Sequence, residues 1–244
     1  MKVLYISNGH IGDAVLSMGI LRYFLDQHPS CKLTVVSAPV VVHLFQDIPQ
    51  LTNCIVVKKK TYRRHWIDIY NQTKQTSWDI IINMRSSGLS YILRAKKRYD
   101  FVWKKPFTHQ HVIEEKQQLF GLPNTPYPNI IVSKQRHELI SNQAKSYHQP
   151  IIAISPFAYW QDKCWPRDKY VDLIKELKQK NEYLSDAYVA VFGGDQDRKN
   201  LPYFQAAFKN SFIDLVNNGH LLDKAAWISH CALYISNDTG GAHM

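Results

Sequence analysis

Short apolar runs alternate with segments of helical spacing along the first part of this chain. The apolar runs are rich in β-branched residues, and one of them, Lys2–Ser7, stands at its start. From Asp13 onwards, apolar residues recur every three or four positions, which is the spacing of a helix that buries one face. Strands that alternate with helices through short connections predict parallel βαβ units. The strands expected here are Lys2–Ser7, Lys32–Ser37, Cys54–Val57, Asp79–Asn83 and Tyr99–Trp103.

The same alternation resumes after a stretch rich in proline. Residues 121–150 contain one glycine and four prolines, so we expect a linker region at 126–150, with a helix over Ser133–Tyr147 as an alternative within it. We therefore expect two α/β domains with mostly parallel sheets, at 1–125 and 151–244. The strands expected in the second domain are Ile151–Ser155, Ala187–Phe192, Phe212–Leu215 and Leu233–Ser236, and its helices are Arg167–Lys180, Arg198–Phe208 and Leu221–His230.

Composition agrees with an ordinary globular protein that is large enough for two cores. Of the 244 residues, 45% are hydrophobic and 20% are charged, and this length favours two modest domains. The four cysteines are scattered without a CxxC pair, which argues against a disulfide framework or a zinc site. The first apolar run is too short for the core of a signal peptide, and no segment approaches the roughly 20 apolar residues that span a bilayer. We therefore expect a cytoplasmic protein.

The net charge of +10 is confined to the first part of the chain. Residues 1–105 contain 16 lysines and arginines and 6 acidic residues, whereas residues 106–244 contain 14 of each kind. Such asymmetry favours an acidic partner, which is nucleic acid, an anionic membrane surface or an anionic substrate. A solvated basic face is the alternative, and the lack of a recognised nucleic-acid motif argues against nucleic acid. The candidate anion-binding residues are Lys58, Lys59, Lys60, Arg63, Arg64 and Arg94.

A glycine-containing turn, Asn8–Asp13, follows the first expected strand. Gly9 and Gly12 permit a tight turn and a close approach of a ligand to the backbone, and a helix is expected to start at or just after Asp13. The spacing is not GxGxxG, so it does not indicate a dinucleotide site. Asp13 is then either a cap or first-turn carboxylate of the helix, or a base that deprotonates a hydroxyl at a crevice between the domains.

Three further segments place polar residues where expected strands of the second domain end. Lys163 follows the first of these strands, where its ammonium can meet a phosphate; a solvated lysine is the alternative. Asp197 follows two glycines and either accepts hydrogen bonds from a ribose or caps the turn. The last segment has glycines that can present N–H groups to a diphosphate, and a histidine that is either a ligand contact or structural. Its residues are Asp238, Thr239, Gly240, Gly241 and His243.

The order of these segments resembles glycosyltransferase family 9, the ADP-heptose:lipopolysaccharide heptosyltransferases. A Gly-Asp turn after the first strand, K-x-W-P at Lys163, F-G-G-x-x-D at Asp197 and N-D-T-G-x-x-H at Asp238 occur in the family's order. The resemblance implies a GT-B fold with two Rossmann-like domains, the donor nucleotide on the C-terminal one and the acceptor on the N-terminal one. It also implies an inverting transfer that needs no metal and no cofactor, with an ADP-sugar as substrate.

The resemblance also implies roles for residues of this chain. Asp13 is expected to be the catalytic base, Lys163 to bind phosphate and Asp197 to hold the ribose. The turn of Asp238, Thr239, Gly240 and Gly241, together with His243, is expected to bind the sugar and the diphosphate. The basic residues of the first domain would then bind an acceptor that carries phosphates and acidic sugars, at the cytoplasmic face of an anionic inner membrane.

Members of the family usually continue beyond the position of Met244 by about two βα units. We therefore expect the second sheet to be incomplete, with an uncovered edge that favours oligomerisation. Two alternatives to transfer from ADP-heptose stay open on the sequence. One is a GT-B transferase that uses another nucleotide-sugar, and the other is a truncated, non-catalytic fragment that binds only an acceptor or a partner.

Overall fold

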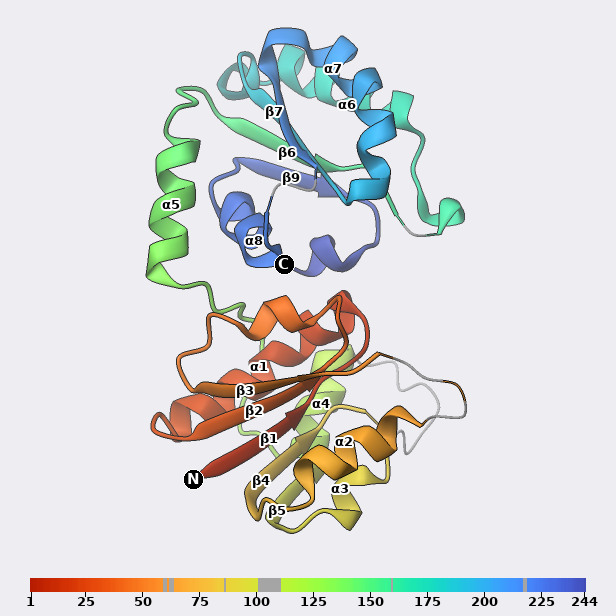
Figure 1. The fold of residues 1–244 in the computed structure, drawn as a ribbon. Coiled ribbons are helices and arrows are strands. Elements are labelled where there is room, and N and C mark those ends of the chain that lie inside the picture. The colour runs from red at the N-terminus through yellow and green to blue at the C-terminus, as the bar shows by residue number, and fades with distance from the viewer. Residues whose placement is uncertain (59–60, 62–63, 86, 101–110, 159, 217–218) are drawn as a thin grey trace. The chain divides into compact units, whose positions relative to one another are not determined.

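The structure is a computed structural model that describes residues 1–244 except 59–60, 62–63, 86, 101–110, 159 and 217–218. The chain divides into two compact units, Met1–Ile131 and Val132–Ala242 (Figure 1). Each unit contains one sheet of parallel strands. The expected α/β class with two parallel sheets is therefore confirmed.

The first unit contains a five-stranded sheet in the order β3-β2-β1-β4-β5, in which all neighbours run parallel. The central strand is buried from Val3 to Ile6 because both faces of a parallel sheet are covered. The strands are β1 (Lys2–Ile6), β2 (Lys32–Ser37), β3 (Leu51–Val56), β4 (Trp78–Asn83) and β5 (Ala95–Asp100).

Three of these strands, β1, β2 and β4, are confirmed to within one residue at either end. β3 begins three residues earlier than expected, at Leu51, and β5 begins four residues earlier, at Ala95. β5 lies at the edge of the sheet, and its residues Lys96–Arg98 are exposed, so no apolar run marks its start. The part of the expected strand at 101–103 lies outside the described residues.

Helix α1 (Ile11–Gln27) follows β1 and buries the apolar face that the sequence pattern predicts. It begins two residues before Asp13, so Asp13 lies within its first turn. Helix α4 (Val112–Phe120) packs against α1 and ends at Gly121, whose φ of 62° is a left-handed conformation that suits glycine. The described part of this unit also contains the helical segments η1 (Val42–Phe45), α2 (His65–Thr73) and α3 (Leu89–Ile92).

Gly19 allows the segment around Pro126 to approach the backbone of α1 closely. A methyl group at Gly19 would overlap the carbonyl oxygens of Pro126 and Tyr127. Both are backbone atoms, so neither can turn away as the end of a flexible side chain can. The lack of a side chain at Gly19 is therefore a condition for packing this segment against α1.

We expect Gly19→Ala to lower the free energy of unfolding by about 2 kcal/mol or more, because the overlap forces the segment away from α1. The higher helix propensity of alanine opposes this effect with only about 1 kcal/mol. Gly88→Ala is the control, since a methyl group there meets no described atom within 4 Å. Urea unfolding measures both variants, and a Gly19 variant as stable as the wild type would contradict the prediction.

The second unit contains a four-stranded parallel sheet in the order β8-β7-β6-β9. The run Ile151–Ile154 on β6 is buried, and β8 and β9 form the two edges of the sheet. β6 and β9 have the expected bounds, and the other two strands differ from expectation by one residue. The strands are β6 (Ile151–Ser155), β7 (Tyr188–Gly193), β8 (Phe212–Val216) and β9 (Leu233–Ser236).

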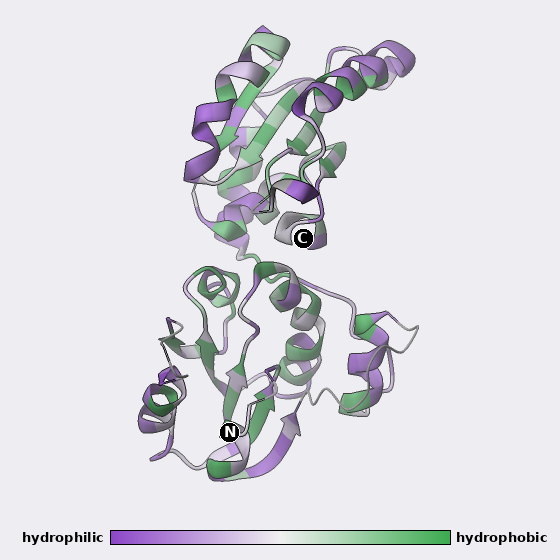
Figure 2. Ribbon diagram, turned by 90° about the vertical axis from the view of Figure 1, so that its right-hand side faces the viewer, coloured by the Kyte–Doolittle hydropathy of each residue, from purple (hydrophilic) through white to green (hydrophobic). Residues whose placement is uncertain are grey.

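Helices cover both faces of this sheet, and successive strand residues point to opposite faces. Ile152 and Ile154 pack with α6 and α7, whereas Ile151 and Ala153 pack with α5 and α8. Figure 2 shows the hydrophobic residues gathered along the strands and the hydrophilic ones on outer parts of the helices. The helices are α5 (Lys134–Ala144), α6 (Arg167–Lys180), α7 (Leu201–Phe208) and α8 (Leu221–Ser229).

Helix α5 belongs to the second unit, although it lies within the expected linker region of 126–150. It packs on α8, and Arg136 forms an ion pair with Asp223 at the start of that helix. The helix begins where the Ser133 hydroxyl accepts a hydrogen bond from a backbone N–H of the first turn. The two units divide after Ile131, so most of the expected linker is part of the second fold.

Helix α7 begins later than the sequence pattern predicts. The expected helix started at Arg198, but residues Asp195–Asn200 form a 3-10 helix and α7 starts at Leu201. Pro202 lies in the first turn of α7, where its missing N–H costs nothing. Of the helices in the described ranges, none is both long and apolar enough to cross a membrane.

Candidate functional site

The polar motifs follow the carboxyl ends of parallel strands in both units. In the first unit the turn Asn8–Asp13 follows β1. In the second unit Lys163 follows β6, Asp197 follows β7 and Asp238 follows β9. Strand ends of one sheet meet at one edge, and ligands of open α/β sheets bind beyond that edge.

Asp13 is exposed and lies in the first turn of α1. His10 is the residue before the helix, and no side chain caps the helix start. Asp13 is therefore a first-turn carboxylate and not a side-chain cap. A negative charge at this position is favoured by the positive end of the helix dipole. Its carboxylate stays accessible to a hydroxyl that has to lose its proton.

A hydrogen-bond network lies directly beneath this turn. The Ser17 hydroxyl donates to the Asp13 carbonyl oxygen over 2.6 Å. The Asn8 amide donates to the Ser17 hydroxyl over 2.9 Å and to the Asp13 carbonyl over 3.1 Å. The Lys116 ammonium, from α4, donates to the same hydroxyl over 2.9 Å. These bonds fix the backbone that carries Asp13.

Lys116 is a charged residue that is only 3% exposed. Burial lowers its pKa from 10.5 to about 8, and the nearby Asp13 carboxylate partly opposes that change. Sequence reasoning missed this residue because no helix was expected at 112–120. A signal was present: Ile113 and Phe120 lie three residues before and four residues after Lys116, so all three share one face of a helix.

We expect Lys116→Met to raise the free energy of unfolding at pH 7 by about 1–3 kcal/mol, because an apolar side chain of similar length replaces a buried cation. In the wild type, the unfolded chain keeps the Lys116 proton up to about pH 10.5, whereas the folded chain releases it near pH 8. The stability of the wild type therefore rises with pH in this window, and the variant lacks that rise.

Denaturant unfolding at pH 7, 8, 9 and 10 measures this difference. Lys97→Met on β5 is the control, since Lys97 is exposed. Equal stability of the wild type and the Lys116 variant across the whole pH range would show that the buried ammonium carries no penalty.

In the second unit, the structure brings Lys163 and Asp238 together. The Lys163 ammonium lies 2.5 Å from a carboxylate oxygen of Asp238, although 75 positions separate them in the sequence. Both side chains are exposed, by 50% and 68%. An exposed ion pair of this kind contributes little to stability. Its consequence is that a cation and a hydrogen-bond acceptor stand side by side at the carboxyl edge of β6 and β9.

Asn237 ties the loop that carries Lys163 to the end of β9. Its side-chain oxygen accepts hydrogen bonds from the Trp165 backbone N–H and the Tyr170 hydroxyl, each over 2.9 Å. Asn237 is buried, and its amide nitrogen has no partner among the described residues. A buried donor without a partner costs about 1–3 kcal/mol, so it is a point where a water or a ligand oxygen would be favourable.

The terminal turn packs on β9. Residues Gly240–His243 form a single 3-10 turn. A Cβ atom at Gly241 would lie 2.5 Å from the Tyr234 hydroxyl, so a side chain there would displace that hydroxyl. That hydroxyl makes hydrogen bonds with Ser155 and Ser236, at the ends of β6 and β9. The turn is therefore held against the carboxyl edge, and Thr239 is the residue directly before it.

Asp197 serves as a cap in the structure. One of its carboxylate oxygens accepts a hydrogen bond from the Gly194 N–H over 2.8 Å. Gly193 is needed for close packing, because a Cβ atom there would lie 2.8 Å from the Phe157 ring. Asp197 is half-buried and remains at the carboxyl edge of β7. The cap and the ribose contact, which the sequence left as alternatives, are compatible because each can use a different oxygen.

The basic residues expected to bind an acceptor are only partly brought together. Lys58, beyond β3, and Arg64, before α2, are both exposed at the carboxyl side of the first sheet. Arg94 lies at the opposite edge, where its carbonyl accepts a hydrogen bond from the first residue of β4. The remaining expected residues lie outside the described ones: Lys59, Lys60 and Arg63.

Arg85 is a cation at the carboxyl edge that sequence reasoning missed. It follows β4, and its guanidinium lies 3.6 Å from the position that a Cβ atom at Gly9 would occupy. It also lies over the Trp66 ring, 5.2 Å from the ring centre, which holds it in place. It therefore stands beside the turn that carries Asp13, which Arg94 does not.

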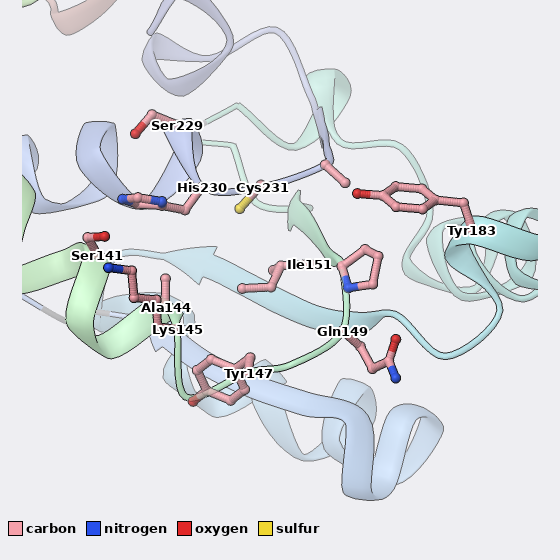
Figure 3. A pocket seen from close by; sticks show the side chains of 12 residues that line it. Ser141, Ala144, Lys145, Tyr147, Gln149, Ile151, Tyr183, Ser229, His230 and Cys231 are labelled. Atoms are coloured by element: carbon pink, nitrogen blue, oxygen red, sulfur yellow. The ribbon is translucent and has the colours of Figure 1, made fainter.

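A pocket of about 520 Å³ lies at the opposite, amino-terminal edge of the second sheet. It opens beside Pro150 at the start of β6 and Ala232 before β9, and Figure 3 shows Lys145 and His230 on its wall. None of the motif residues lines it. Within the described ranges, no group of three or more His, Cys, Asp or Glu side chains is placed to hold a metal ion.

Comparison with known proteins gives a family and a fold. The sequence model of glycosyltransferase family 9 (heptosyltransferase) matches residues 84–244, which is more than half of the chain. Lipopolysaccharide heptosyltransferase 3 of Escherichia coli K12 is 20% identical over 272 residues, with 96% of this chain and 76% of the relative covered.

Solved structures are similar over nearly the whole chain. A family 9 glycosyltransferase from Veillonella parvula has a TM-score of 0.77 and 17% identity, with 99% of this chain and 76% of that chain covered. The E. coli heptosyltransferase WaaC, solved with ADP, has a TM-score of 0.74 and 15% identity, with 100% and 83% covered. These likenesses confirm the expected GT-B fold class. The second sheet, with four strands against five, is the smaller part of that fold here.

Proposed function

Because the chain belongs to glycosyltransferase family 9 and is therefore a glycosyltransferase, we propose that it transfers a heptose from ADP-heptose to the lipopolysaccharide core or a related acceptor. The observation that carries this proposal is the pairing of Lys163 with Asp238 at the carboxyl edge of β6 and β9, inside the matched region. WaaC has been solved with ADP and with ADP-2-deoxy-2-fluoro heptose, which supports ADP-heptose as the donor to test first.

The proposed reaction is a direct displacement with inversion. Asp13 accepts the proton of an acceptor hydroxyl, and the oxygen attacks the anomeric carbon of the heptose. The bond from that carbon to the diphosphate oxygen breaks, and ADP leaves with the bonding electrons. Charge grows on the diphosphate as the bond breaks, and the Lys163 ammonium is suited to neutralise it. The chemistry calls for a base and an anion-binding group, and this proposal assigns no step to a metal.

The remaining donor contacts follow from the same residues. Asp197 holds the ribose with the carboxylate oxygen that does not cap Gly194. The turn of Asp238, Thr239, Gly240 and Gly241, with His243, holds the sugar and the diphosphate. When the diphosphate binds, the Lys163 ammonium leaves Asp238 and pairs with a phosphate oxygen. The Asp238 carboxylate can then accept a hydrogen bond from a sugar hydroxyl.

On the acceptor side, the described residues place three cations at the carboxyl edge of the first sheet, Lys58, Arg64 and Arg85. Their chemistry suits an anionic glycolipid that carries phosphates or acidic sugars. The excess positive charge of the first part of the chain would then hold the enzyme at the cytoplasmic face of an anionic inner membrane. Arg94 has no place in this arrangement because it lies at the other edge.

The donor is tested by nucleotide release. We expect ADP to appear when the protein is incubated with ADP-heptose and a heptose-acceptor core oligosaccharide, and no nucleotide to appear with UDP- or GDP-sugars. If only UDP or GDP is released, the donor is another nucleotide-sugar and not ADP-heptose. If no donor is turned over although ADP binds in calorimetry, the chain is a non-catalytic binder.

We expect Asp13→Ala to abolish transfer while the Kd of ADP changes less than about twofold, because Asp13 acts on the acceptor hydroxyl and not on the nucleotide. Asp26→Asn on the same helix is the control, since Asp26 is exposed and pairs with Arg22 on its own helix. Turnover assays and calorimetry measure the two quantities. An equal loss of transfer and of ADP binding would mean that Asp13 has a structural role.

A further inference from the structure

Lys224 is a cation at the carboxyl edge of the second sheet that no sequence motif indicates. It lies in the first turn of α8, and its ammonium donates a 2.6 Å hydrogen bond to the carbonyl oxygen of Gly193, the last residue of β7. The start of α8 is fixed in turn. The Asp223 carboxylate accepts a hydrogen bond from the His220 N–H over 2.9 Å and pairs with Arg136. Lys224 is thus held in one place.

The surroundings of Lys224 are those of a binding group. Its side chain is half-buried, and burial lowers its pKa, while the nearby Asp197 carboxylate partly opposes that change. An ammonium has three N–H donors, and the described residues supply one acceptor, the Gly193 carbonyl. A partly buried ammonium with donors to spare favours a further oxygen or nitrogen acceptor beside it.

The strand order places Lys224 relative to the other donor residues. Lys163 follows β6, Asp238 follows β9 on one side of β6, and Lys224 lies at the end of β7 on its other side. Neighbouring strands are about 4.8 Å apart. A nucleotide whose diphosphate lies at the ends of β6 and β9 therefore extends its nucleoside across the end of β7, where Asp197 and Lys224 stand.

We propose that Lys224 binds the nucleoside part of the donor, with one N–H kept on the Gly193 carbonyl and another donated to an oxygen or ring nitrogen of that nucleoside. This inference rests on the proposed function, and it adds a second cation to the donor site. The two cations contact different parts of the nucleotide. Lys163 meets the diphosphate at β6, and Lys224 meets the nucleoside at β7, beside Asp197.

The chain offers a matched control in Lys178 on α6. Its ammonium donates over 2.8 Å to the carbonyl of Ala187, which lies just before β7 at the amino-terminal edge of the same sheet. Its pKa is also lowered by burial. Lys178 and Lys224 therefore make the same kind of bond at opposite ends of one strand. Loss of a structural bond alone would affect Lys178→Met and Lys224→Met alike.

Calorimetry with ADP and with AMP tests the proposal, because the two share the nucleoside and differ in the diphosphate. For Lys224→Met we expect the Kd values of ADP and AMP to rise by a similar factor, about tenfold. For Lys163→Met we expect a larger rise for ADP than for AMP. For Lys178→Met we expect neither to change. Thermal unfolding of each variant checks that the fold is intact, and Lys224→Gln replaces Lys224→Met if the latter does not fold.

The proposal would be overturned if the Lys224 variant bound ADP and AMP as tightly as the wild type does. It would also be overturned if the Lys178 variant lost as much affinity for the two nucleotides as the Lys224 variant. If the Lys224 variant lost affinity for ADP but not for AMP, the proposal would also be overturned, because Lys224 would then contact the diphosphate and not the nucleoside. If the wild type binds UDP or GDP and not ADP, ADP-heptose is not the donor. Lys224 is then tested in the same way with that nucleotide and its monophosphate. If the wild type binds no nucleotide, both proposals fail together.

Discussion

The parallel pairing of β6 with β9, with Ser155 opposite Ser236, is the constraint on which the candidate donor site depends. Because the two strands run parallel in this register, their following loops leave the sheet side by side. Lys163 and Asp238 meet there, and the Asn237 side chain fastens one loop to the end of the other strand. The first sheet repeats the principle, since the pairing of β1 with β4 brings Arg85 beside the turn of Asp13.

Two buried or half-buried lysines lie near the candidate functional carboxylates. Lys116 lies beneath Asp13 and Lys224 lies beside Asp197, and burial lowers the pKa of both ammonium groups. Burying a cation opposes folding unless its partners compensate, so such positions are candidates for function. Burial alone does not identify a functional lysine. Burial also lowers the pKa of Lys178, and that residue lies at the amino-terminal edge of the second sheet. Position at the carboxyl edge is what separates Lys224 from Lys178.

The residues that hold the candidate site are less exposed than the residues that would touch substrate. Asp13, Lys163 and Asp238 are exposed, whereas Ser17 and Asn237 are buried and fix the backbone on either side of them. Buried hydrogen bonds to the backbone set where each exposed group can lie. A ligand then finds its contacts already placed, which reduces the entropy cost of binding.

The sequence by itself determined the α/β class, most strand positions and the motif residues, because hydrophobic periodicity and glycine turns are local properties. It missed the start of β5, where exposed lysines form an edge strand, and it gave the helix at Ser133–Tyr147 only as an alternative within a linker, whereas α5 belongs to the second unit. Only the tertiary structure decided that Arg94 lies at the wrong edge, and that Lys116 and Lys224 lie beside carboxylates. Those contacts join residues far apart in the chain, and strand order and register, which no local pattern encodes, bring them together.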